Sequence, residues 1–223
     1  MDRSLFEADA LEVAPKLLGG VLRVNSVEGV VGIRLTEVEA YHGVGTPGPY
    51  DAGSHSRNRR TERNAAMFGE PGCAYVYLSY GIHYALNLVC SPPGIASAVL
   101  LRAGEVIEGV ELARARRTSG ISDHQLARGP GNLGQALGIT RAEHNERDLG
   151  EDPFEWEPPA SAPTHFARGP RVGVALEAGG PLFPWRFWLP GEPSVSSFRR
   201  GRNAPAWKFQ PERDVLPWSF LQP

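Results

Sequence analysis

The stretch VVGIRLTEVEAY, residues 30–41, predicts one long β-strand, because β-branched and apolar residues recur in it with period 2. That period puts six side chains on one inward face: those of Val31, Ile33, Leu35, Glu37, Glu39 and Tyr41. Two interpretations of the carboxylates remain open. Either the strand bulges or ends after Leu35 and they face water, or one of them lies at the edge of an apolar pocket, where it becomes a candidate general base.

Further elements are predicted on both sides of this strand. Asp9 is typical of a helix N-cap, and Gly19-Gly20 would end that helix. Residues 73–89 predict a hairpin that folds at Tyr80-Gly81, with Tyr80 at its tip. In residues 98–102, alternation places Arg102 on an apolar face, where it needs a carboxylate or phosphate partner such as Glu39. The other expected elements are a short strand at 21–24, helices within 108–117 and 133–137, a surface loop at 152–163, short strands at 169–176, 186–189 and 194–197, and an extended arm at 199–223.

The composition is that of an ordinary globular protein. The chain has 223 residues, of which 41% are hydrophobic and 22% charged, which excludes a disordered, collagenous or coiled-coil protein. It contains no apolar run long enough to span a membrane, its first residues do not resemble a signal peptide, and its two cysteines are compatible with a reducing compartment. We therefore expect one intracellular, cytoplasmic domain without a membrane partner.

Although the net charge is −2, the chain contains local basic segments. Arginine supplies all but two of the 23 basic residues, the exceptions being Lys16 and Lys208. Arginines gather in residues 57–63, 114–117 and 199–202. The forked guanidinium suits phosphate binding, although a bias of the genome against lysine codons would give the same count.

Several common chemistries are absent from the sequence. GPGNLG, residues 129–134, matches a dinucleotide fingerprint literally, but no buried strand precedes it, so a turn that opens a helix is the better interpretation. The six histidines and two cysteines lack metal-ligand spacing. There is no nucleophile elbow and no P-loop, and neither lysine suits a Schiff base. We therefore expect neither a metal nor a cofactor.

Acids, tyrosines, a histidine, an asparagine and arginines are concentrated between residues 37 and 102. Such a set suits a flat, partly polar ring bound beside a carboxylate. Stacking of a base on an aromatic side chain contributes about 1–3 kcal/mol, comparable with the few kcal/mol needed to extrude a base from a duplex. Recognition of a flipped base is therefore energetically plausible.

Six motifs occur in an order that resembles the alkyladenine (3-methyladenine) DNA glycosylase family. They are TEVEAY (36–41), DAGSHS (51–56), TERNAAMF (61–68), AYVYLSYG (74–81), AVLLRA (98–103) and GPGNL (129–133). The resemblance extends from about Leu5 to about Ser197. It implies an enzyme of base excision repair that hydrolyses the N-glycosidic bond of alkylated or deaminated purines in double-stranded DNA, leaves an abasic site and has no AP-lyase activity.

The resemblance also implies a role for individual residues. Glu39 would be the general base that activates water, and Arg102 and the carbonyl of Val172 would help to hold that water. The base-binding pocket would consist of Tyr41, Gly53, His55, Tyr77 and Asn87. Tyr80 would intercalate into the duplex, and Thr61, Arg63 and Met67 would contact DNA.

The implied fold is α+β, with a curved, mostly antiparallel sheet flanked by helices, similar to the C-terminal domain of formyltransferases. We expect a monomer, with one domain over residues 1–198 and a C-terminal extension at 199–223 packed on it. Two rival functions are a catalytically silent protein that binds damaged DNA, which would have no use for Glu39 and Arg102 together, and an acyl-transfer protein, which would lack the tyrosine-lined pocket.

Overall fold

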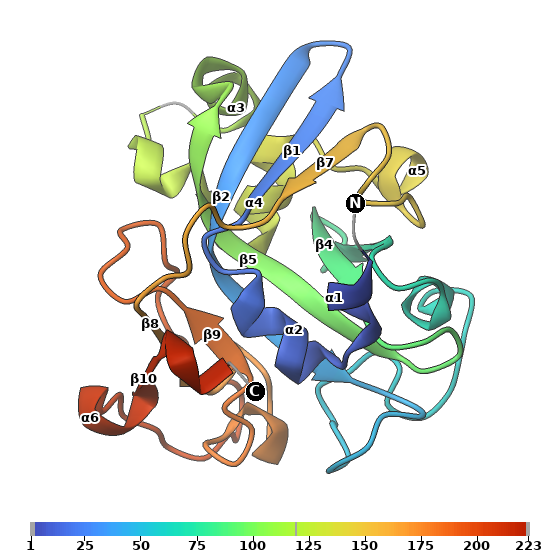
Figure 1. The fold of residues 1–223 in the computed structure, drawn as a ribbon, viewed down its shortest axis with the longest axis vertical. Coiled ribbons are helices and arrows are strands. Elements are labelled where there is room, and N and C mark those ends of the chain that lie inside the picture. The colour runs from blue at the N-terminus through green and yellow to red at the C-terminus, as the bar shows by residue number, and fades with distance from the viewer. Residues whose placement is uncertain (1–2, 119, 222–223) are drawn as a thin grey trace.

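The long strand expected at residues 30–41 is the central strand of one sheet in the computed structural model, which describes residues 3–118 and 120–221 (Figure 1). All strand pairs in the described residues are antiparallel. The strand order is β10-β8-β9-β2-β5-β4-β3, while β1 pairs with β2 and β7, and β6 pairs with β5. The strands are β1 (Val21–Ser26), β2 (Gly29–His42), β3 (Ala74–Ser79), β4 (His83–Val89), β5 (Ser97–Glu108), β6 (Ala127–Arg128), β7 (Phe154–Glu157), β8 (His165–Gly169), β9 (Arg186–Trp188) and β10 (Val215–Pro217).

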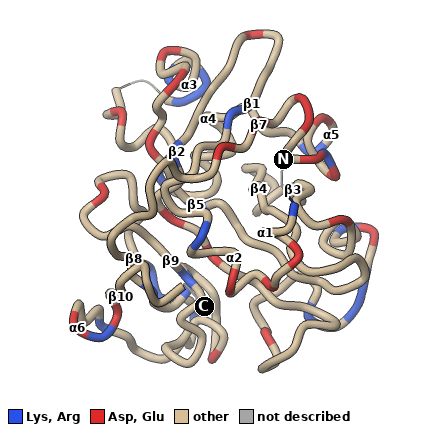
Figure 2. The backbone as a smooth tube through the Cα atoms, viewed as in Figure 1, with Lys and Arg blue, Asp and Glu red and all other residues tan. Residues whose placement is uncertain are grey.

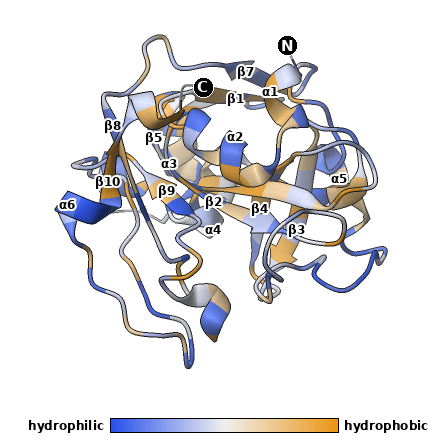
Figure 3. Cartoon of the chain, turned by 60° about the horizontal axis from the view of Figure 1, so that its bottom comes forward, coloured by the Kyte–Doolittle hydropathy of each residue, from blue (hydrophilic) through white to orange (hydrophobic). Residues whose placement is uncertain are grey.

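Helices are few and short. Asp9 caps α2 as expected, because its side chain accepts hydrogen bonds from the N–H groups of Leu11 and Glu12. Apolar side chains of α2 and α4 join those of β2 and β5 in one buried core, and Figure 3 shows the apolar residues concentrated in the central strands. The helices are α1 (Ser4–Glu7), α2 (Ala10–Lys16), α3 (Val110–Arg116), α4 (Pro130–Leu137), α5 (Arg141–His144) and α6 (Pro211–Asp214), with 3-10 turns η1 (Ala65–Phe68), η2 (Asp123–Gln125), η3 (Glu177–Gly179) and η4 (Trp218–Leu221). The predicted α+β class is confirmed, and the likeness to formyltransferase domains stays a prediction.

Uninterrupted alternation would put Glu37 and Glu39 on the face of Leu35, and that placement was wrong. The strand bulges, as one of the two open interpretations had it, but both side chains are fully buried and do not face water. The register with β5 shifts twice between Leu35 and Val38, which marks a β-bulge. As a result Leu35 and Val38 both face the main core, and the carboxylates lie on the opposite face of the sheet. The bulge therefore moves two acids out of the apolar core and towards a polar site.

Other elements differ from the sequence prediction in extent. The strand predicted at 98–102 is the twelve-residue β5, and the expected surface loop at 152–163 contains the short strand β7. Of the strand predicted at 169–176, only Gly169 lies in a strand, at the end of β8, and residues 170–176 and 194–197 are irregular. Positive φ angles at Gly173 (+73°) and Leu176 (+57°) are incompatible with a continuous strand.

The C-terminal segment was expected as an extended arm, but it contributes an edge strand to the sheet. In β10, Val215 pairs with Ala167 and Pro217 with His165 of β8. Trp218 packs edge-on against the buried Phe166. The division into residues 1–198 and 199–223 stays a prediction, but the extension is joined to the sheet by backbone pairing. Among the described residues, no helix has the length and apolar character needed to cross a bilayer.

Candidate active site

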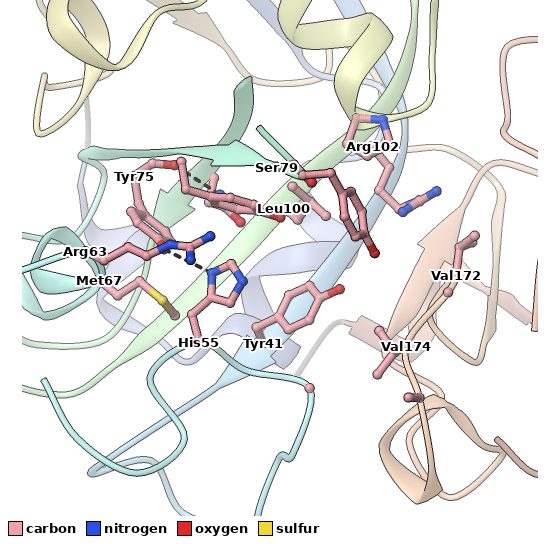
Figure 4. Close-up of a pocket in the computed structure, with 17 residues that line it drawn as sticks. Tyr41, His55, Arg63, Met67, Tyr75, Ser79, Leu100, Arg102, Val172 and Val174 are labelled. Atoms are coloured by element: carbon pink, nitrogen blue, oxygen red, sulfur yellow. Dashed lines mark hydrogen bonds between the residues drawn. The ribbon is translucent and has the colours of Figure 1, made fainter. Parts of the chain in front are cut away.

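A cavity of about 540 Å³ opens on the face of the sheet that carries the displaced carboxylates. Its walls come from β2, β3, β4 and β5, from the loop that joins β2 to β3, and from the segment after β8. Figure 4 shows His55, Tyr75 and Arg63 on one side of the cavity and Val172 and Val174 on the other, with Tyr41 between them. Segments far apart in the sequence thus meet in one pocket.

Glu39 lies behind the pocket wall and is fully buried. Its Oε1 accepts a hydrogen bond of 2.7 Å from the Val172 N–H, and its Oε2 accepts one of 2.8 Å from the Tyr41 hydroxyl. The guanidinium of Arg102 approaches Oε1 to 3.4 Å. Burial, together with the negative charge of Glu39, raises the pKa of Tyr41 well above its usual range, so that its hydroxyl keeps the proton it donates. All three neighbours act as donors or cations, an arrangement suited to an ionised carboxylate.

Arg102 is held mainly by Glu37, a contact that the sequence did not predict. The Arg102 Nε donates to Glu37 Oε1 at 2.9 Å, and the Arg186 Nε donates to the same oxygen at 2.6 Å. Ser196 contributes its N–H to Oε2 at 2.7 Å and its hydroxyl to Oε1 at 2.9 Å. Glu37 is therefore the centre of a buried polar cluster that fixes Arg102 beside Glu39. The expected contact between Arg102 and Glu39 is present, but it is the longer of the two carboxylate contacts.

The charge of Glu37 makes the stability of the fold dependent on pH. Burial by itself raises the pKa of Glu37, but the guanidiniums of Arg102 and Arg186 and the bonds from Ser196 outweigh it and hold the pKa below its usual 4.5. A carboxyl group with a depressed folded pKa contributes stability above its unfolded pKa and loses it as the pH falls through the folded one. We therefore expect Glu37→Gln to be less stable than the parent at neutral pH, and the gap to narrow below about pH 4.5. Urea unfolding over a pH series measures the difference in the free energy of unfolding between the parent and Glu37→Gln. A difference that does not depend on pH would contradict the role of Glu37.

Tyr41 is fixed from behind by a buried ion pair that the sequence also left unassigned. Arg171 and Asp51 are both fully buried and form two parallel hydrogen bonds of 2.6 and 2.7 Å. The guanidinium of Arg171 stacks 4.4 Å from the Tyr41 ring centre and 5.0 Å from that of Trp185. Asp51 also accepts the N–H of Gly53 at 2.9 Å, which ties the pocket loop to the pair. The pair thus links β2, the loop at 51–56 and the segment that carries Val172.

The aromatic wall of the pocket comes from β3 and the loop at 51–56. The His55 ring lies edge-on to Tyr77, with ring centres 4.5 Å apart, and its Nδ1 is 3.1 Å from the Tyr75 hydroxyl. Burial, aided by Arg63 and Arg57, lowers the pKa of His55, so the ring is neutral at neutral pH. Burial also raises the pKa of Tyr77 to about 12. Asn87 lines the pocket and donates to the Tyr75 carbonyl at 3.0 Å.

Gly53 shows why the loop at 51–56 approaches the pocket so closely. A Cβ at this position would lie 2.8 Å from the Val174 side chain and 3.0 Å from Arg171 Nη2. The Arg171 atom cannot yield, because Arg171 is held by Asp51, and Val174 belongs to the opposite wall of the pocket. The absence of a side chain therefore allows the two walls to meet.

Tyr80 lies at the hairpin tip between β3 and β4, as expected. It is 94% exposed, and φ angles of 51° at Tyr80 and 70° at Gly81 form the tight turn. Among the predicted DNA contacts, Arg63 lines the main pocket, and Thr61 lines a smaller adjoining cavity of about 240 Å³. Met67 is only 2% exposed, and its sulfur accepts a bond from the Ser56 hydroxyl. Figure 2 shows the basic run at residues 57–63 at the edge of the molecule.

The structure brings the predicted site residues together. Ten of them line the main pocket: Tyr41, Gly53, His55, Arg63, Met67, Tyr77, Tyr80, Asn87, Arg102 and Val172. Glu39 contacts three of these, and Thr61 lies in the adjoining cavity. Sequence reasoning assigned no role to Tyr75, Asp51, Arg171, Arg186 or Ser196, and it considered Glu37 only as an alternative candidate for the general base. Among the described residues, no three His, Cys, Asp or Glu side chains are placed to hold a metal ion.

Comparison with known proteins identifies the family of this chain. The family model for methylpurine-DNA glycosylase matches residues 4–193. Relatives from Leifsonia xyli subsp. xyli, Streptomyces avermitilis and Nocardia farcinica are each named "Putative 3-methyladenine DNA glycosylase". They are 52%, 46% and 48% identical over 202, 202 and 203 residues, which cover 88–89% of this chain and 91–92% of each relative. The chain therefore belongs to the methylpurine-DNA glycosylase family.

Proposed function

We propose that the protein is a monomeric, monofunctional glycosylase that flips alkylated or deaminated purines out of duplex DNA and hydrolyses their N-glycosidic bond. The observation that supports it best is the buried Glu39 carboxylate, which is held by Val172, Tyr41 and Arg102 at the wall of a tyrosine-lined pocket. A binding protein without catalytic activity would have no need for this carboxylate and its network. Family membership supports the substrate class, a damaged purine in DNA.

In the proposed reaction, Glu39 accepts a proton from a water molecule as the water oxygen bonds to C1′ of the flipped nucleotide. The bond from C1′ to the base nitrogen breaks, and its electron pair leaves with the base. The three residues that contact Glu39, which are Tyr41, Arg102 and Val172, line the pocket that would supply the water. We assign Arg102 and the Val172 carbonyl to holding this water. General-base catalysis of this kind contributes about 10² to 10⁴-fold, and the carboxylate also stabilises positive charge that develops on the sugar.

The aromatic walls of the pocket suit an electron-poor or cationic purine. Tyr41, His55 and Tyr77 would enclose the base, with Tyr41 stacking against it, and the neutral ring of His55 would not repel a cation. The Gly53 carbonyl and the His55 N–H would bind the edge of the base. Asn87 is fixed by its bond to the Tyr75 carbonyl and would crowd the exocyclic amine of guanine, which disfavours normal purines. Alkylation that leaves a positive charge also makes the base a better leaving group.

We assign Tyr80 as the wedge that fills the gap left by the flipped nucleotide. Its side chain is exposed at a turn and contributes almost nothing to the core. Tyr80→Ala should therefore weaken affinity for lesion DNA by about 5- to 150-fold, as expected from loss of one base-stacking contact of about 1–3 kcal/mol, and leave thermal stability nearly unchanged. Ile82→Ala, which truncates another exposed side chain close to the tip, is the control. Equal lesion affinity of Tyr80→Ala and the parent would remove Tyr80 from this role.

The function is tested by single-turnover release of free base from duplexes that contain methylated purines, hypoxanthine or ethenoadenine, with EDTA present. Alkali is added afterwards to cleave abasic sites. Release of base with strands intact before alkali is the expected result, and it would also identify the preferred lesions. Strand cleavage before alkali would contradict the monofunctional assignment. Tight lesion binding without release would instead support the catalytically silent binder.

A further inference from the structure

The residues that orient Glu39 and Arg102 are themselves held by a segment at the C-terminal side of the family match. We propose that residues 194–204, here called the C-terminal strap, position both of these groups, so that the site is incomplete without them. The matched region ends at residue 193, one residue before the strap. The proposal rests on the proposed role of Glu39. It assigns the strap a positioning role, with no direct contact to substrate.

The first half of the strap holds Arg102. Ser196 bonds both oxygens of Glu37, as described above, and its hydroxyl also accepts a bond of 3.1 Å from Arg102 Nη2. The Ser196 carbonyl accepts a bond of 2.8 Å from Arg186 Nη2. One serine thus contacts the carboxylate and both cations of the buried cluster. Two residues earlier, the hydroxyl of the buried Ser194 forms a hydrogen bond of 2.9 Å with the hydroxyl of Thr36, which lies in the bulge of β2.

The second half of the strap holds the segment that carries Val172. The Gly173 N–H donates to the Arg199 carbonyl at 2.8 Å, and the Leu176 N–H donates to the Arg202 carbonyl at 3.1 Å. Between these two bonds, Gly201 lies so close to Val174 that a Cβ on it would be 1.9 Å from the Val174 carbonyl oxygen. The strap therefore fits against the backbone of residues 173–176 with no room for a side chain at Gly201.

This contact matters because Val172 belongs to an irregular segment. Residues 172–176 form no strand pair in the structure, so their backbone position depends on neighbouring bonds. The Val172 N–H is the donor to Glu39 Oε1, and the next N–H along the chain is the one bound by the strap. A shift of the strap would consequently move the donor that orients the proposed base. Displacement of a reacting group by about 1 Å can reduce a rate by about 100-fold.

The first half is tested with Ser196→Ala, which removes the hydroxyl but keeps the N–H that binds Glu37. We expect single-turnover base release to fall by about 10-fold or more, with lesion affinity close to that of the parent. Ser196→Thr keeps a hydroxyl and should restore most of the rate. Ser197→Ala is the matched control, because the side chain of this neighbouring serine is exposed and its hydroxyl accepts one long hydrogen bond, of 3.5 Å, from Arg128. Equal rates for Ser196→Ala and Ser197→Ala would overturn this half of the proposal.

The second half is tested with Gly201→Ala and a readout that does not require activity. Amide hydrogen exchange at Val172, Gly173 and Leu176 should become at least about 10-fold faster than in the parent, because the added Cβ displaces the strap. Base release should slow in parallel. Gly20→Ala is the control, since its Cβ would meet the Trp156 ring at 2.2 Å, a steric conflict that does not involve the pocket.

The possible outcomes distinguish failure of the proposed role of the strap from failure of the proposed function. Unchanged hydrogen exchange at these three amides in Gly201→Ala would overturn the proposed role of the strap, whatever the activity of the parent. Faster exchange in both Gly201→Ala and Gly20→Ala would also overturn it, since the effect would then be general loosening of the fold. No base release by the parent would overturn the proposed function alone, because the exchange measurement would still decide whether the strap holds Val172.

Discussion

Glu39→Gln is expected to slow single-turnover base release by about 10² to 10⁴-fold, the contribution typical of a general base. Glutamine has nearly the same shape, and its amide oxygen can still accept the bond from the Val172 N–H. The Tyr41 hydroxyl can rotate to accept a bond from the amide nitrogen, and Arg102 keeps its bond to Glu37. The folded protein and its lesion affinity should therefore be preserved while turnover is lost.

The control for this experiment is Glu155→Gln. It removes a carboxylate of β7 that is exposed and forms a long ion pair, of 3.5 Å, with Arg23. Its base release should match that of the parent. Lesion affinity is measured for both variants by equilibrium binding to a duplex with one ethenoadenine. Unchanged turnover in Glu39→Gln would remove Glu39 from the role of base. Loss of lesion binding together with turnover would show instead that the carboxylate serves mainly to build the pocket.

Local sequence patterns predicted the elements that depend on neighbouring residues. The Asp9 cap and the exposed position of Tyr80 both follow from short-range rules of capping and turns, and both are confirmed. Period 2 also identified β2. It failed at the orientation of the carboxylates, because a bulge between Leu35 and Val38 reverses the alternation and no residue type there signals it.

The parts of the site that sequence reasoning missed are contacts between distant segments. Glu37 and Ser196 are 159 residues apart, and Asp51 and Arg171 are 120 apart. A single sequence shows that each of these residues is polar, but not which partner it finds after folding. The available signal was the need of every buried charge for a partner, which correctly led from Arg102 towards the acids of β2. Applied to Arg171, the same requirement would have predicted an acidic partner without identifying Asp51.

Arg171→Met is expected to lower the free energy of unfolding by about 3–5 kcal/mol, because it leaves the carboxylate of Asp51 buried without its cation. Both side chains are fully buried, and methionine fills the space between Tyr41 and Trp185 without replacing any hydrogen bond. Urea unfolding at neutral pH measures the loss. Arg213→Met is the control, because Arg213 forms an ion pair with Asp214 from a largely exposed position and should change stability little.

The double variant Asp51→Asn/Arg171→Met distinguishes a broken pair from a simple packing defect. With the carboxylate also removed, no charge remains buried without a partner, so the double variant should lose clearly less stability than the sum of the two single variants. Strict additivity would show that the two side chains act independently, contrary to the bonds of 2.6 and 2.7 Å between them. Because Arg171 also supports the Tyr41 ring from behind, the double variant, if folded, should still bind lesion DNA less tightly than the parent. If the double variant regains stability but not affinity for lesion DNA, Arg171 makes two separate contributions, one to the stability of the fold and one to the position of Tyr41.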